Sequence, residues 1–495
     1  MLRRTLLTLV FTACLTTRAP AQTTETLPEP PREFRAMWVA TVKNIDWPNA
    51  EDRDSPSRMR AHMHRLLDTA EQLNMHAVLF QARPTADALY ASDLEPWSEW
   101  LTGAQGRAPN GLYDPLAEWT EACHERGLEL HVWLNPYRAR HRDAKTPMAA
   151  PHLAIRRPDL VHTHGDYQWI DPGEPDAKEH VMRIMRDVVT RYDVDGLVFD
   201  DYFYPYPVDG VEFPDHRAWS VYQRSGGDLT RADWRRRNVD RLITRMRKEL
   251  RAIRPDLIIG VSPFGIWRPN NPPGVIGFDA YDKLYADARR WLREGWIDYL
   301  APQLYWPIDS KGQPFEPLLV WWERQNTAGR RVYVAQYTSR IRPEGEATQW
   351  EPAEIIEQIK VMRHRSKAPG QIHFSAIALE HNHRGVADAL RKGPYRTRSL
   401  PPRIESADLP ALAAPNVTLA NDSALVRAEW TVEGDVRQWV VWSRRAGDWS
   451  VQVLPLRDRS IALSREINGR ALEALAVAAV GPGGSDGPPR IVRLD

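Results

Sequence analysis

The sequence predicts an α/β fold, a (β/α)8 barrel of the TIM type at residues 32–395, followed by a small all-β domain at residues 416–495. Three observations support this. The chain of 495 residues is too long for one ordinary domain. Short apolar runs alternate with longer amphipathic segments from residue 34 to about residue 392, which is typical of a parallel sheet with crossover helices. After residue 416 the pattern changes to short strand-like runs separated by turn residues.

The apolar runs number eight, as a closed barrel requires. They cover residues 34–42, 77–81, 128–134, 196–200, 257–261, 299–303, 331–336 and 372–379. Between them, apolar residues recur at three- and four-residue spacing and predict helices at 57–73, 115–126, 179–192, 231–253, 281–293 and 354–365.

The C-terminal part begins with a linker at residues 396–415, rich in alanine and proline. The runs beyond it predict a sandwich that resembles a fibronectin type III module. Such a module acts as a spacer or stabilising appendage, or binds glycan through Trp439 or Trp442; we favour the first role.

The N-terminus reads as an export signal at residues 1–21. Arg3 and Arg4 precede an apolar run that is too short to span a bilayer, and small residues precede Gln22. Lipid attachment at Cys14 is the alternative to cleavage after Ala21, so we expect a periplasmic or secreted protein, or a tethered lipoprotein. With Cys14 removed or acylated, Cys123 has no disulfide partner and is expected to be buried.

The charge balance excludes several classes of partner. A formal net charge of +1 gives no field that would attract nucleic acid or an anionic membrane. No phosphate-binding loop, nucleophile elbow or dinucleotide fingerprint is present, so we predict no cofactor. The cluster of His162, His164 and Asp166 lacks the spacing of a zinc enzyme, and we predict no metal.

Polar and aromatic residues follow several of the apolar runs, where a barrel would present its C-terminal rim and its active site. As ligands for sugar hydroxyls and N-acetyl groups, or as stacking walls, we predict Trp38, Gln81, Arg83, Asn135, Tyr137, Tyr202, Phe264, Trp267, Gln303, Tyr305, Trp306 and Gln336. Strand-end polar groups also satisfy backbone and helix ends in any barrel, which is the competing explanation.

The sharpest signal is the segment at residues 195–205, where an apolar strand ends in Asp200 and Asp201 and three aromatic residues follow. Glycosidic cleavage uses one carboxylate at the oxocarbenium-like centre and one protonated carboxyl group at the leaving oxygen. We predict Asp200 as nucleophile or electrostatic stabiliser, with Asp201 tuning it or contacting sugar hydroxyls. Alternatively, one of the two caps the following turn.

Several blocks, at residues 32–48, 81–90, 133–138, 195–205, 262–268, 285–287 and 297–306, closely resemble the glycosyl-hydrolase-like family 10 proteins in the expected order. The resemblance implies a barrel related to glycoside hydrolases, placement in the cell envelope, and cleavage of peptidoglycan glycan strands that lack stem peptides. It supports the fold more strongly than the substrate.

The segment ending at Asp200 also resembles the fourth-strand motif of the amylase-type barrels, whose final Asp is the nucleophile. Those barrels commonly carry their acid, a Glu, after the fifth strand, whereas this chain has Ser262 and no nearby carboxylate there. Asp201, Asp309 and Glu380 are therefore the candidates for the acid.

We expect an envelope glycoside hydrolase that acts on an amino-sugar polysaccharide. The missing acid after the fifth strand is the best argument for the alternative, a non-catalytic glycan-binding scaffold protein. A third reading, metal-dependent deacetylation, requires a metal site that the sequence does not indicate.

Overall fold

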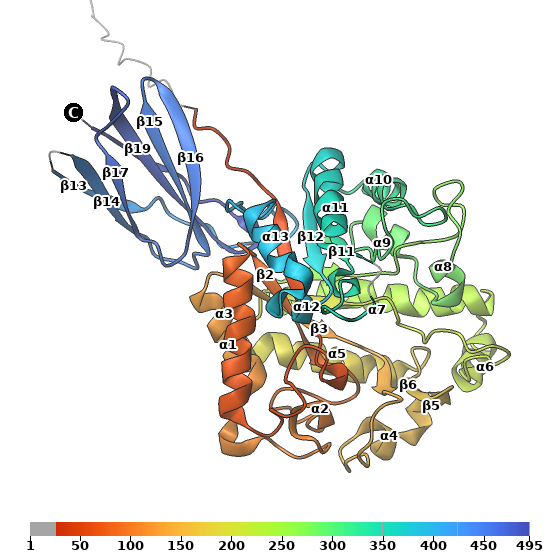
Figure 1. Ribbon diagram of the computed structural model, residues 1–495. Helices are drawn as coiled ribbons and strands as arrows, with labels where there is room; N and C mark the ends of the chain where they lie inside the picture. Colours follow the sequence, from red (N-terminus) through yellow and green to blue (C-terminus); the bar gives the residue numbers. More distant parts are fainter. Residues whose placement is uncertain (1–25, 348–349, 423, 495) are drawn as a thin grey trace, which may run out of the picture.

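The computed structural model describes residues 26–347, 350–422 and 424–494, which form a barrel with a β-sandwich beside it (Figure 1). The α/β barrel and the C-terminal sandwich predicted from the sequence are both confirmed. The proposed signal segment and Cys14 lie outside the described residues. No helix in the described part of the chain is long and apolar enough to cross a membrane.

Within these residues, eight parallel strands close into a ring, because β1 pairs with β2 on one side and with β12 on the other. The seventh strand is divided at Tyr333: its first half pairs with β9 and its second half with β12. The strands are β1 (Phe34–Val39), β2 (Ala77–Arg83), β3 (Glu129–Leu134), β7 (Gly196–Phe199), β8 (Ile258–Val261), β9 (Tyr299–Leu300), β10 (Arg331–Val332) with β11 (Val334–Gln336), and β12 (Gly370–His373).

Helices pack around the ring and begin where the sequence offers a cap. Helix α1 starts with proline after Ser55, and the Thr230 hydroxyl accepts from the Asp233 backbone N–H at 3.1 Å to cap α7. The outer helices are α1 (Pro56–Gln72), α3 (Pro115–Glu125), α5 (Pro175–Arg191), α7 (Arg231–Ile253), α9 (Ala288–Arg293), α10 (Phe315–Gln325), α11 (Pro352–Arg365), α12 (Ala376–Glu380) and α13 (Val386–Lys392). The helix predicted at 281–293 is broken into α8 (Ala280–Lys283) and α9.

Alternate residues of each strand point into the barrel, as the two-residue period of a strand requires. On β1, Phe34, Ala36 and Trp38 belong to the inner cluster, and on β7 Val198 does. A Cβ on Gly260 would lie 2.0 Å from the ring of Tyr299, so only glycine leaves room for that ring inside the barrel. The interior is thus filled by side chains below the rim.

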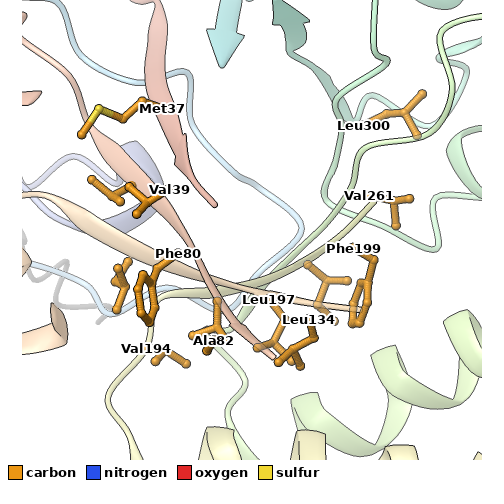
Figure 2. Packing of buried hydrophobic residues seen from close by; sticks show 14 of the residues in the cluster. Met37, Val39, Phe80, Ala82, Leu134, Val194, Leu197, Phe199, Val261 and Leu300 are labelled. Atoms are coloured by element: carbon orange, nitrogen blue, oxygen red, sulfur yellow. The ribbon is translucent and has the colours of Figure 1, made fainter. Parts of the chain in front are cut away.

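The intervening residues point outward and pack beneath the helices. Figure 2 shows this layer, including Met37, Phe80, Leu197, Phe199 and Val261 from neighbouring strands. Because both faces are buried, the strands are nearly continuous apolar runs. This explains why the barrel strands were recognisable in the sequence.

Loops at the rim carry additional elements. A three-stranded antiparallel sheet of β4 (Arg138–Arg140), β5 (Val161–His164) and β6 (Tyr167–Ile170) follows β3. The other rim and loop helices are α2 (Glu99–Thr102), α4 (Leu153–Arg156), α6 (His216–Arg224) and α8 (Ala280–Lys283).

The C-terminal part is built of two antiparallel sheets, with strand orders β13-β14-β17 and β16-β15-β19, the latter extended by β18 and β20. Trp430 and Trp439 pack against each other between the sheets, with their ring centres 6.0 Å apart. The strands are β13 (Asn416–Asn421), β14 (Leu425–Thr431), β15 (Gln438–Arg445), β16 (Asp448–Pro455), β17 (Ser460–Ser464), β18 (Glu466–Ile467), β19 (Arg470–Val480) and β20 (Arg490–Arg493).

The idea of a glycan site at Trp439 or Trp442 is not supported. Trp439 is buried between the sheets, and its indole N–H donates to the Leu456 carbonyl at 3.0 Å. Trp442 is buried under the N-terminal segment and donates to the Pro28 carbonyl at 2.8 Å. Neither ring presents a free face to a sugar.

The sandwich packs against the end of the barrel opposite the rim. Arg437 of the segment before β15 forms a buried ion pair of 2.6 Å with Asp195, just before β7, and the Gly483 N–H donates to Glu129 at 2.6 Å. The segment at 396–415 joins this contact, because Leu400 and Ile404 are buried. The rim therefore stays free of the sandwich.

Candidate active site

A pocket of about 180 Å³ opens at the carboxyl ends of the barrel strands. Asp200 reaches it because it continues the inward-facing series of β7 after Val198, whereas Asp201 reaches it because the chain has already left the strand. The pocket is lined by Trp38, Ala40, Val42, Ile45, Trp133, Asp200, Asp201, Tyr202, Ser262, Gln303, Tyr305 and Phe374.

Asp200 is held by donors on one of its two oxygens. Its Oδ2 accepts from Asn135 Nδ2 at 2.5 Å and from the Trp133 indole N–H at 3.3 Å. Its Oδ1 has no hydrogen-bond partner among the described residues. A buried polar atom without a partner is unusual in a folded protein, and this oxygen belongs to a side chain that lines the pocket.

The pKa of Asp200 is shifted in the direction that a proton donor needs. Burial first, and then the neighbouring charge of Asp201, raise this pKa from 3.8 to about 7, against the opposing effect of Arg138. Two carboxyl groups this close do not ionise together at low cost. Asp200 therefore keeps its proton up to near neutral pH, where it is about half protonated.

Asp201 is surrounded by donors on both oxygens. The Tyr206 hydroxyl donates to Oδ2, and Gln303 Nε2 donates to Oδ1 at 3.2 Å. Burial raises the pKa of Asp201, while these hydrogen bonds lower it. The pair can thus hold one proton, with the negative charge favoured on Asp201.

A polar network fixes Asn135, and through it Asp200. Gln81 Nε2 donates to Asn135 Oδ1 at 2.7 Å, and Arg138 Nη2 donates to the same oxygen at 3.1 Å. Gln81 in turn accepts from the backbone N–H groups of Thr41 and Val42 at 2.9 Å. The amide of Asn135 is therefore oriented with its N–H toward the carboxyl group.

Comparison with known proteins identifies the family of this chain. The model of the family described as "Glycosyl hydrolase-like 10" matches residues 33–351. The chain belongs to the glycosyl hydrolase-like 10 family. The family assignment confirms the sequence prediction of a glycoside hydrolase, whereas the roles of individual residues stay predictions.

Two relatives align with most of the chain. Glycosyl hydrolase YngK of Bacillus subtilis is 37% identical over 395 residues, which are 78% of this chain and 76% of that protein. Glycosyl hydrolase DigH of Escherichia coli K12 is 34% identical over 358 residues, 68% of this chain and 79% of that protein. Among solved structures, the PgaB glycoside hydrolase domain from Bordetella bronchiseptica overlaps with a TM-score of 0.47 at 15% identity, covering 73% of this chain and 98% of that chain.

Of the predicted binding residues in this family member, Trp38, Tyr202, Gln303 and Tyr305 line the pocket, and Asn135 contacts Asp200. Phe264 and Trp306 pack edge to face on each other, with their ring centres 5.6 Å apart. They lie beside Gln303, and neither lines the pocket. Gln81 is fully buried and acts through Asn135, as described above.

Other predicted ligands are structural. Arg83 is buried in an ion pair with Glu95 at 2.6 Å, and Gln336 donates to Gln358 at 3.1 Å beneath the rim. Tyr137 is fully buried. Trp267 stacks on Trp321 at 5.9 Å, outside the pocket. In each case the side chain packs within the protein outside the pocket.

The prediction that Glu380 is catalytic needs correction. The run at 372–379 was read as a strand, but the strand ends at His373, and Glu380 ends helix α12. Its carboxylate pairs with His62 at 3.1 Å and with Arg65 at 3.2 Å, both on α1. Asp309 is exposed and also lies outside the pocket. Within the described residues, Asp200 and Asp201 are the acidic groups that line it.

The sequence reasoning missed several lining residues. Trp133, Ile45 and Phe374 form walls, and Tyr206 holds Asp201. Trp133 lies inside one of the motif blocks, and Tyr206 lies next to another. Trp133 could have been predicted, because it is two residues before Asn135 and alternate residues of a strand point to the same face. Across the described chain, no group of three or more His, Cys, Asp or Glu is arranged to hold a metal ion.

Proposed function

We propose that this glycosyl hydrolase-like 10 member is an exported envelope enzyme that cleaves an amino-sugar polysaccharide, with peptidoglycan glycan strands lacking stem peptides as the substrate. The observation that carries the catalytic part is the carboxyl pair at the floor of an aromatic pocket. The names of YngK and DigH support the reaction class.

The pair supplies both functions that glycosidic cleavage needs. Asp200, whose pKa is raised to about 7, donates its proton to the leaving glycosidic oxygen. Asp201 keeps a negative charge that stabilises the oxocarbenium-like centre as the C–O bond breaks. Water then adds its oxygen to that carbon and gives a proton to the Asp200 carboxylate, which restores the acid. This proposal reverses the predicted order of the two residues, and the raised pKa of Asp200, caused by burial and by the charge of Asp201, supports it.

The walls of the pocket suit a sugar ring. Trp38 and Trp133 meet edge to face at 4.9 Å, and Tyr305 and Phe374 stand at 6.0 Å from each other on the other lining segments. Amphipathic rings of this kind pack against the apolar faces of sugars while polar groups bind their hydroxyls.

Purified full-length wild type and the Asp200→Asn variant, incubated with denuded and with peptide-bearing peptidoglycan, test the proposal. Mass spectrometry is expected to show soluble saccharides when the wild type is incubated with denuded strands. No products are expected from the variant or from peptide-bearing peptidoglycan. Equal release by the Asn variant would refute the role of Asp200.

One observation favours a second candidate, a non-catalytic glycan-binding protein. The two pocket carboxyls are adjacent in sequence, whereas the usual pairs flank the bond from separate positions about 5–10 Å apart. This candidate predicts saturable binding of glycan by the wild type without new reducing ends.

A further inference from the structure

A second cavity, of about 630 Å³, lies at the rim between the β4–β6 sheet and the loop that follows β7. It borders the catalytic pocket, because Tyr202 lines both. We propose that this cavity is a subsite that binds the carboxylate of an acidic sugar residue next to the bond that is cut. The inference rests on the proposed function and names a chemical feature of its substrate.

Arg138 carries the argument, since it is a buried guanidinium without an ion pair. It is 6% exposed, and its three side-chain hydrogen bonds within the described residues go to neutral oxygens: the Pro84 carbonyl at 2.8 Å, the Tyr202 hydroxyl at 2.8 Å and Asn135 Oδ1 at 3.1 Å. Within the described residues, no carboxylate lies within 4.0 Å of it.

The neighbouring Arg83 provides a direct contrast. It is also buried, but Glu95 neutralises it, because Arg83 Nε and Nη2 each donate to one carboxylate oxygen of Glu95 at 2.6 Å. Taking an arginine out of water without such a partner is costly. Arg138 lowers the pKa of both pocket carboxyls from a distance, and two of its five N–H groups remain for a ligand.

Arg142 adds a second cation at the mouth of the cavity. It is exposed, its guanidinium lies 5.8 Å from the ring centre of Tyr167, and no ion pair ties it to a carboxylate of the described chain. The adjacent Asp143 pairs instead with Lys43 at 2.8 Å. Asp166, at the exposed turn between β5 and β6, is the acidic residue among those that line the cavity. The lining therefore carries two arginines and one carboxylate.

The remaining titratable groups do not cancel this charge. Burial lowers the pKa of His164, which keeps its ring neutral at physiological pH, and burial raises the pKa of Tyr206, which keeps its hydroxyl protonated. Trp169 and Tyr202 meet at 5.8 Å and supply an aromatic wall. An arginine fork beside an aromatic wall suits a sugar that bears a carboxylate, because the guanidinium binds carboxylate in two parallel hydrogen bonds.

Lactyl-ether amino sugars and uronic acids are two kinds of sugar residue that carry such a group. The probes are therefore tetrasaccharides from denuded peptidoglycan and from hyaluronan, each as the free acid and as the methyl ester. Full-length Asp200→Asn protein, which would leave the chain uncut, is titrated with each probe by calorimetry. Arg142→Gln in the same background removes the exposed cation, and Arg156→Gln, on the exposed face of α4, is the matched control.

We expect the peptidoglycan acid to bind about 10-fold more tightly than its ester, as a charge-assisted pair contributes. Arg142→Gln should reduce this ratio to below about 3-fold, whereas Arg156→Gln should leave it unchanged. A preference for the acid in hyaluronan instead would support the subsite and assign it to uronic acids. Equal affinity for acid and ester in both glycans, or a ratio that Arg142→Gln does not change, would overturn the proposal. Failure of the proposed hydrolysis is seen separately, as an absence of products from the wild type while the acid preference persists.

Discussion

Replacing Asp200 by Asn should stabilise the barrel at alkaline pH, because the wild type must ionise a buried carboxyl group beside Asp201. The Asn side chain keeps an oxygen that accepts from Asn135, and it carries no charge. A pKa raised by folding means that the folded state holds a proton more tightly than the unfolded state does. That stabilising contribution is complete below pH 3.8 and is lost as the pH rises through about 7.

The magnitude follows from the shift. A rise from 3.8 to about 7 is about three pKa units, and each unit corresponds to about 1.4 kcal/mol, so the ceiling is about 4 kcal/mol. The free energy of unfolding of Asp200→Asn relative to the wild type should therefore increase between pH 4 and pH 8, by a substantial part of this amount. Urea titrations followed by tryptophan fluorescence at several pH values measure it.

Asp309→Asn provides the control, since it removes an exposed carboxylate outside the pocket. Its unfolding free energy should run parallel to that of the wild type across the same pH range. If the curves of Asp200→Asn and wild type are parallel too, folding does not raise the pKa of Asp200. The assignment of Asp200 as proton donor then fails.

Three further variants test other parts of the structure. Glu380→Gln should leave kcat within about 2-fold of the wild type, since the side chain pairs with His62 outside the pocket; a loss of 100-fold would restore it as the catalytic acid. Gln303→Ala removes a donor to the second carboxyl of the pair and should lower kcat by about 10- to 100-fold with a small change in stability, as steady-state kinetics and thermal melts would measure; an unchanged kcat would contradict the role of this donor. Arg437→Met removes the guanidinium that pairs with the buried Asp195, which keeps His124 at 2.9 Å, and should cost about 3 kcal/mol in urea unfolding, while KM stays the same; a loss below 1 kcal/mol would mean that the pair contributes little to joining sandwich and barrel.

The barrel was predictable because its strands are buried on both faces and therefore appear as nearly continuous apolar runs, as on β7 and β8. The run at 372–379 misled because apolar residues of β12 continue directly into those of α12, and a short apolar run does not distinguish strand from helix. Glu380 was misplaced for this reason alone.

The carboxyl pair was recognisable from the sequence, but its protonation was not. The order of the two roles depends on burial and on which neighbours donate to each oxygen, and these come from Asn135, Gln303 and Tyr206 on three different segments. Likewise, Arg83 ends β2 and Arg138 comes soon after β3, and the presence of Glu95 beside Arg83 alone separates a structural arginine from one available to a ligand. Such pairings over long sequence distances leave no local pattern.

The most direct test of the central claim is product analysis on denuded peptidoglycan strands with the wild type and Asp200→Asn at pH 6 and pH 8. The account predicts soluble saccharides from the wild type, fewer at pH 8 because Asp200 loses its proton through a pKa of about 7, and no turnover by the variant at either pH. Undiminished release of the same saccharides by Asp200→Asn, or a wild-type rate that rises from pH 6 to pH 8, would contradict it.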